Sequence, residues 1–69
     1  MQDIKDCKGR LTCRGDALTG LVEFLYKGQL TSTILSPGEI FAIERQGVVT
    51  EVLRTRYNTF NIRSYEKAS

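Results

Sequence analysis

The chain of 69 residues contains no histidine and no tryptophan, and it has only one proline and two cysteines. Without histidine it lacks the side chain that most often serves as a general base near neutral pH. Neither the nucleophile motif G-x-S-x-G nor the phosphate-binding motif G-x-x-x-x-G-K-[ST] occurs in it. A sheet this small also has little room for a water-excluding pocket. We therefore predict that the protein is not an enzyme, needs no cofactor and binds no small-molecule substrate.

The two cysteines, Cys7 and Cys13, are poorly placed for a disulfide. On one straight strand they would lie about 20 Å apart, well beyond bonding range. If Lys8-Gly9 forms a tight turn, Cys13 faces Ile4 instead of Cys7. Two free thiols are typical of a reducing compartment, so we expect a cytoplasmic protein. Two cysteines without histidine also cannot complete a zinc site unless carboxylates or a second subunit contribute, and we predict no metal site.

Long apolar runs are absent as well. Stretches such as residues 40–43 are far shorter than the roughly 20 residues that a membrane-spanning helix needs. The first ten residues show no apolar segment of a secretory signal. We expect no membrane contact and one small domain over residues 1–69, with residues 1–6 and 66–69 frayed. Because a chain this short buries only about 60% of its unfolded surface, its core should be thin.

Short β-rich segments separated by glycine are what the sequence does contain. Valine, isoleucine, threonine and aromatic residues suit a pleated, half-buried surface, and they dominate six segments: residues 10–14, 21–27, 29–35, 40–45, 48–54 and 60–65. The tetrapeptide Ser36-Pro37-Gly38-Glu39 predicts a type II turn. The pattern predicts an all-β protein, a small antiparallel meander or half-barrel of five or six strands that is SH3-like or OB-like.

One region also fits a helix. Leu18, Leu21, Val22 and Leu25 fall at helical spacing, so the alternative fold is α+β with one helix at about 16–27 packed on the sheet. Gly20 would then lie inside the helix, at a cost of about 1 kcal/mol relative to alanine. The sequence around Gly28 also suits a tight hairpin between two strands. We favour the strand.

Alternation of side chains along these strands predicts which residues form the core. Residues Arg14-Gly15-Asp16 are expected in a loop where Gly15 takes a positive φ, and the charged residues of 3–10 are expected to be solvated. The predicted core consists of Leu11, Val22, Phe24, Leu30, Ile34, Phe41, Ile43, Val52, Phe60 and Ile62.

The C-terminal hairpin allows two registers. With a five-residue loop at 55–59, Arg54 points inward opposite Phe60, and Glu51 faces Arg63 on the outer side. With a two-residue turn at Tyr57-Asn58, the arginines would gather with Tyr65 on one outer face and form a basic platform. That second register turns Glu51 toward the core, which is costly for an unpaired carboxylate. The first register is therefore favoured.

Two functions remain as hypotheses. The first is a non-catalytic module that binds another protein, or a second copy of itself as a homodimer, through a sheet edge or an apolar face. Its candidate interface residues are left over by a thin core: Leu21, Leu25, Val49 and Leu53. The alternative is sequence-tolerant nucleic-acid binding by the basic C-terminal hairpin, where residues 54–69 carry four basic side chains against one acidic. Its candidate residues are Arg54, Arg56, Tyr57, Asn61, Arg63 and Tyr65.

Overall fold

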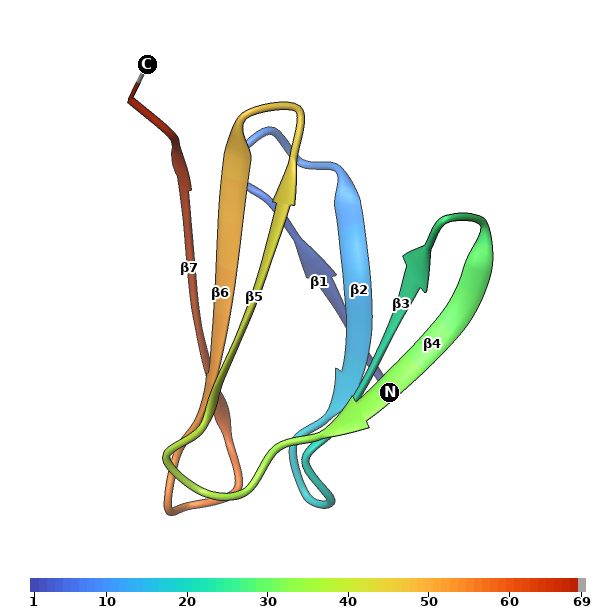
Figure 1. Cartoon of the computed structure of the whole chain (residues 1–69). Helices are drawn as coiled ribbons and strands as arrows, with labels where there is room; N and C mark the ends of the chain where they lie inside the picture. The colour runs from blue at the N-terminus through green and yellow to red at the C-terminus, as the bar shows by residue number, and fades with distance from the viewer. Residues whose placement is uncertain (69) are drawn as a thin grey trace.

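The computed structural model describes residues 1–68, and within that range it is all-β with no helix (Figure 1). Seven antiparallel strands follow one another as a meander in these residues: β1 (Gln2–Lys5), β2 (Leu11–Asp16), β3 (Leu21–Tyr26), β4 (Gln29–Ile34), β5 (Ile40–Arg45), β6 (Val48–Arg54) and β7 (Phe60–Glu66). The all-β prediction is confirmed. The alternative helix at 16–27 is wrong, because this region is a turn followed by β3. Accordingly, none of residues 1–68 belongs to a helix that could span a membrane.

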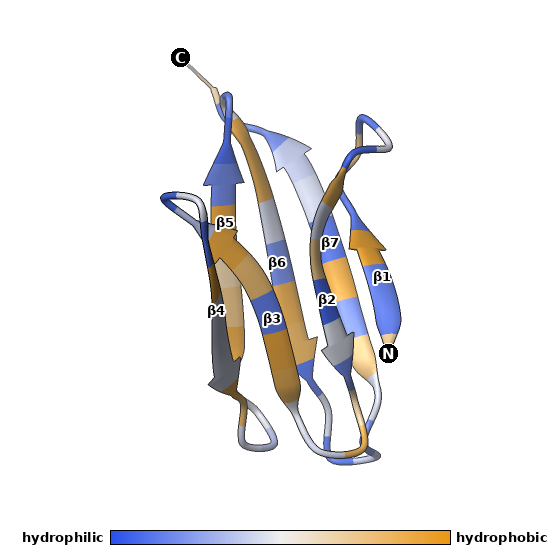
Figure 2. Ribbon diagram, turned by 90° about the vertical axis from the view of Figure 1, so that its right-hand side faces the viewer, coloured by the Kyte–Doolittle hydropathy of each residue, from blue (hydrophilic) through white to orange (hydrophobic). Residues whose placement is uncertain are grey.

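The strands form two sheets instead of one continuous curled sheet. Strands β1-β2-β3-β4 make the four-stranded sheet, and β5-β6-β7 make the three-stranded sheet. The sheets face each other as two layers, with β3 and β4 diverging from the rest at one end (Figures 1 and 2). All six segments predicted as strands are strands. The remaining strand, β1, was not predicted, because its alternating charged residues are also typical of a solvent-exposed terminal segment.

Two tight turns set the register of two hairpins. Lys27-Gly28 joins β3 to β4, and Gln46-Gly47 joins β5 to β6. In both turns the first residue has φ 51° and the glycine φ 78°. Positive φ at both central positions identifies type I′ turns, whose twist matches that of antiparallel strands. The turn predicted between residues 36 and 39 also exists, with Gly38 at φ 90° and the Glu39 amide donating to the Ser36 carbonyl at 2.9 Å.

The core lies between the two sheets. A cluster of buried residues forms its centre: Ile4, Cys13, Val22, Leu35 and Val52. Three half-buried phenylalanines pack against this cluster: Phe24, Phe41 and Phe60. Four residues predicted in the core are exposed, namely Leu11, Leu30, Ile34 and Ile62. Leu30 and Ile34 point outward because they pair with outward-facing Leu25 and Leu21. Ile62 lies on β7, which has no neighbouring strand on its far side within residues 1–68.

The loop between β1 and β2 is ordered around one buried carboxylate. Asp6 accepts hydrogen bonds from the amides of Lys8 (2.9 Å) and Arg10 (3.0 Å), and from Nε of Arg10 (3.0 Å). The expectation that the charges of this segment are all solvated is therefore wrong for Asp6, which is buried. Strand β1 pairs with β2, placing Ile4 opposite Cys13. The prediction that residues 66–69 are frayed includes Ser69, and Ser69 lies outside the described residues.

Candidate interaction site

The C-terminal hairpin adopts the register that keeps Glu51 out of the core. Arg54 pairs with Phe60, Val52 with Ile62, and Glu51 with Arg63. The loop at 55–59 is closed by the Thr55 amide, which donates to the Thr59 carbonyl at 2.9 Å. The two-residue turn at Tyr57-Asn58 is therefore wrong. Glu51 and Arg63 form an ion pair at 3.2 Å across the outer face, which neutralises one of the basic groups that a platform would need.

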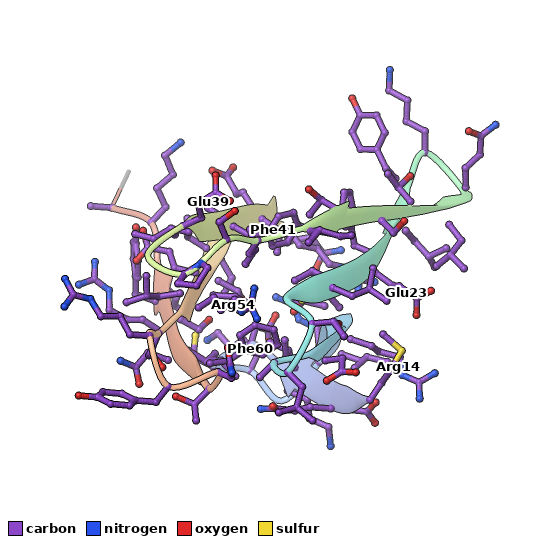
Figure 3. All side chains as sticks on the ribbon, turned by 90° about the horizontal axis from the view of Figure 1, so that it is seen from below. Arg14, Glu23, Glu39, Phe41, Arg54 and Phe60 are labelled. Atoms are coloured by element: carbon purple, nitrogen blue, oxygen red, sulfur yellow. The ribbon has the colours of Figure 1, made fainter. Side chains whose placement is uncertain are left out.

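Arg54 is held between the two sheets (Figure 3). Its Nη1 donates to the Leu35 carbonyl at 2.8 Å, and its Nη2 donates to the Leu18 carbonyl at 2.9 Å and to Oδ1 of Asn58 at 3.0 Å. The bonds to Leu18 and Leu35 connect β6 with the turn that precedes β3 and with the residue that follows β4. Sequence reasoning had placed Arg54 among the nucleic-acid candidates, but its guanidinium is committed to groups of the protein itself.

The other nucleic-acid candidates lie in two separate places. Arg56 and Tyr57 are exposed in the loop at 55–59, whereas Asn61, Arg63 and Tyr65 share the outer face of β7. The Arg63 guanidinium lies over the Tyr65 ring, 5.1 Å from its centre. The structure therefore brings together only half of the predicted set.

The apolar candidates also divide between the two sheets. Leu21 and Leu25 are on the outer face of the four-stranded sheet, and Val49 and Leu53 are on the outer face of the three-stranded sheet. Leu25 is the most exposed of them, while the other three are half-buried. Leu21 and Leu25 therefore belong to a different surface from Val49 and Leu53.

The β3–β4 hairpin carries the largest aliphatic exposure, including two residues that sequence reasoning missed. Leu25 pairs with Leu30, and Leu21 pairs with Ile34, on the same outer face. Leu25 and Leu30 are each 69% exposed, and Ile34 is 68% exposed. Figure 2 shows most of β3 as hydrophobic. We call Leu21, Leu25, Leu30 and Ile34 the hairpin face. The tight turn at Lys27-Gly28 could have revealed it, since that turn fixes Leu30 opposite Leu25.

A groove of about 890 Å³ lies beside the hairpin. It forms because β2 and β3 pair only near the turn that connects them, from Asp16–Leu21 to Arg14–Glu23, and separate beyond the Arg14–Glu23 pair. Leu11 on β2, Phe24 and Tyr26 on β3, and Phe41 and Ile43 on β5 contribute to its lining. Phe24 and Phe41 remain in contact across it, with ring centres 4.8 Å apart. Apolar side chains are thus accessible on both faces of the β3–β4 hairpin.

Reactive groups are sparse in the described part of the chain. Cys13 is buried, which raises the pKa of its thiol, and a weak hydrogen bond from the Thr12 hydroxyl opposes that shift. Cys7 is exposed. Among residues 1–68, no three or more histidine, cysteine, aspartate or glutamate side chains are grouped to hold a metal ion. The exposed residues of the β3–β4 hairpin offer apolar contact, and the outer strand of that hairpin offers backbone hydrogen bonding.

Comparisons with known proteins give no further guide to function. No family model, no curated protein and no solved structure matches the chain.

Proposed function

We propose that the protein is a non-catalytic interaction module that binds a protein partner through the hairpin face. The observation that carries the proposal is the exposure of Leu25, Leu30 and Ile34, each about two-thirds accessible on one side of a single hairpin. Single exposed leucines are ordinary, but several large aliphatic side chains exposed on one face of a single hairpin are typical of an interaction site.

The arrangement of the hairpin supports this proposal. Only Glu23 interrupts the aliphatic residues of the outer face on β3, and it pairs with Ser32 on β4. The hairpin face lies on the outer side of the four-stranded sheet, away from the three-stranded sheet, so a partner can reach it without displacing other described elements. Burying one leucine of this kind stabilises a complex by about 1.5–3 kcal/mol before the costs of association.

Site-specific photocrosslinking tests the proposal. A photoreactive phenylalanine analogue replaces Leu25 in one protein and Leu18 in a matched control, because Leu18 is equally exposed but lies in the turn before β3. Incubation with an extract of the source cells should give a protein adduct at position 25 and little at position 18. A second change, Leu30→Ser, should reduce the adduct at position 25. Equal labelling at both positions, or no adduct at position 25, would contradict the proposal.

Nucleic-acid binding stays a prediction with weaker support. Arg54 is used internally, Arg63 is paired with Glu51, and the Arg63 guanidinium lies over the Tyr65 ring, which leaves Arg56, Tyr57 and Asn61 as the more accessible candidates. If they bind single-stranded nucleic acid, affinity should fall steeply with salt. An absence of binding at low salt would remove this alternative.

A further inference from the structure

The edge of β4 differs chemically from the other exposed sheet edges. Within residues 1–68 each sheet ends in two strands, and three of these four end strands carry charged residues. The charged residues lie on β1 (Asp3 and Lys5), on β5 (Glu44 and Arg45) and on β7 (Arg63 and Glu66). Strand β4, with the sequence QLTSTI, has no charge and no proline. Natural proteins use charge and proline to prevent pairing between sheet edges, so β4 is the unprotected edge.

The tight turn determines which backbone groups of β4 point outward. Tyr26 and Gln29 close the type I′ turn and form a hydrogen-bonded pair. In an antiparallel ladder bonded and non-bonded pairs alternate, so Thr31 and Thr33 also direct their backbone groups toward β3. The amides and carbonyls of Leu30, Ser32 and Ile34 therefore point away from β3. No strand of residues 1–68 pairs with them.

We infer that the partner of this edge is a second copy of the chain, joined by antiparallel β4–β4 pairing with Ser32 opposite Ser32 of the other copy. This inference rests on the proposed function, because it identifies the partner of the same hairpin. In this register Leu30 lies opposite Ile34 of the second copy, and Ile34 lies opposite Leu30. Every outward-pointing residue of β4 then meets an outward-pointing residue, and each such pair exchanges two hydrogen bonds.

The same register also aligns the hairpin faces of the two copies. Leu25 and Leu30 of one copy continue into Ile34 and Leu21 of the other, because the cross-strand pairs of each hairpin are Leu25–Leu30 and Leu21–Ile34. The two-fold axis repeats this aliphatic row on its other side. On the opposite face Thr31 meets Thr33 of the second copy, a pairing that favours adjacent strands. A shift by two residues in either direction removes one backbone pair and places Ser32 against an aliphatic residue.

A closed two-fold interface of this kind uses the same patch on both molecules. It joins the two four-stranded sheets into one and leaves β4 with no exposed edge. Because the contact involves one strand and four aliphatic side chains per copy, we expect a reversible dimer and not an obligate one.

The first test measures mass in solution. Sedimentation of the purified chain between about 10 µM and about 1 mM should show a concentration-dependent rise from 7.8 kDa toward twice that mass. Ser32→Pro removes an outward-facing amide that the β3–β4 ladder does not use, and proline is tolerated at such edge positions. It should weaken the dimer by roughly tenfold or more. Circular dichroism of the variant checks that the fold is kept.

The second test measures the register. In a Cys7→Ser background, which removes the exposed native thiol, Ser32→Cys places two thiols opposite each other at the two-fold axis. The backbone separation of a directly opposed pair is within disulfide range. Mild oxidation should therefore crosslink Ser32→Cys chains. The matched control Leu30→Cys should crosslink much less, because its counterpart in the second copy lies four positions away along the strand.

The outcomes separate the inference from the proposed function. A chain that stays monomeric up to about 1 mM, or equal crosslinking of the two cysteine variants, would overturn β4–β4 pairing. If the monomer still gives a position-specific photoadduct of another mass through Leu25, the hairpin face binds a different protein and the proposed function stands. A dimer that Ser32→Pro leaves intact would also overturn the inference, because the contact would then lie elsewhere.

Discussion

At the scale of single residues, Arg54 is a side chain that connects several segments of the fold through its hydrogen bonds. It projects from the inner face of β6 and reaches two backbone carbonyls and one amide oxygen on other segments. Gly20 makes room for the contact between Arg54 and Leu35, because a Cβ at that position would overlap the Leu35 carbonyl oxygen and lie 2.7 Å from Nη1 of Arg54. A planar guanidinium can serve several acceptors at fixed angles, which an ammonium group cannot.

We predict that Arg54→Lys destabilises the protein by about 1–3 kcal/mol, because at least one of its acceptors, which include the part-buried carbonyl of Leu35, loses its donor. Arg56→Lys is the matched control. Arg56 is exposed in the neighbouring loop, and its replacement should change stability by about 0.5 kcal/mol or less. Urea unfolding of both variants measures the difference. Equal midpoints for the two variants would show that the internal hydrogen bonds of Arg54 contribute nothing.

The two thiols should differ in reactivity. Cys7 is exposed, whereas Cys13 is buried opposite Ile4 and its pKa is raised by that burial. Since the thiolate is the reactive form, a thiol reagent added to the folded protein should modify one cysteine quickly and the second only on unfolding. Mass spectrometry after brief labelling locates the adduct. Rapid modification of Cys13 in folded protein would contradict its placement in the core.

At the scale of elements, β2 depends on a glycine for a reason that differs from our prediction. Gly15 was expected to need a positive φ in a loop, yet it lies within β2 and is not among the residues with positive φ. A Cβ there would lie 2.7 Å from Cε2 of Phe60, on β7 of the opposite sheet. Gly15 is therefore required for close packing between the sheets.

We predict that Gly15→Ala costs about 1–3 kcal/mol, since Phe60 must move out of a packed position. Phe60→Leu is also expected to destabilise, but in the double variant the alanine has more room. The two effects should therefore combine to less than their sum. Urea denaturation of the wild type, both single variants and the double variant gives this coupling. Strict additivity would indicate that Gly15 and Phe60 do not interact.

Local sequence signals located the strands and turns more accurately than they identified which side chains are buried. Tight turns depend on the φ values of two residues, so Lys27-Gly28 and Pro37-Gly38 could be located from sequence. Burial depends on which strands lie across the core, and that is not encoded locally. Leu30 and Ile34 were therefore assigned to the core by hydrophobicity, although the register places them outside. The inward position of Arg54 followed from the favoured register, but its acceptors come from distant segments.

At the scale of the whole molecule, the two sheets are joined at opposite ends. Arg54 joins them at one end. At the other end the loop between β1 and β2 contacts β7 and the β5–β6 turn (Figure 1). The amide of Cys7 donates to Oγ of Ser64 at 2.9 Å, Lys8 forms an ion pair with Glu66, and Nη1 of Arg10 donates to Oε1 of Gln46 at 2.5 Å. The side between these ends, next to the β3–β4 hairpin, stays open as the groove.

Asp6, in the loop between β1 and β2, should make the free energy of unfolding decrease at acid pH. Burial alone would raise the pKa of Asp6, but the hydrogen bonds from the Arg10 and Lys8 amides and from the Arg10 side chain outweigh it. Its pKa is therefore below the ordinary 3.8. The pKa of Glu66 is also lowered, by its hydrogen bond and charge interaction with Lys8. A carboxylate with a lowered pKa stabilises the fold fully above its unfolded pKa, and this contribution is lost as pH falls through the folded value.

We therefore predict that the wild type keeps its stability from about pH 7 down to about pH 5 and loses it progressively below about pH 4. Asp6→Asn should be less stable at neutral pH, because an amide cannot accept from all three donors and leaves Arg10 without its charged partner. It should also lose less stability on acidification, since one of the titrating groups is gone. Urea midpoints at several pH values measure both effects. Asp3→Asn is the control: it removes an exposed ion pair with Arg14, which contributes little, and should leave the acid slope close to that of the wild type. If Asp6→Asn also follows the wild-type slope, the buried carboxylate is not what makes the joined sheets sensitive to acid.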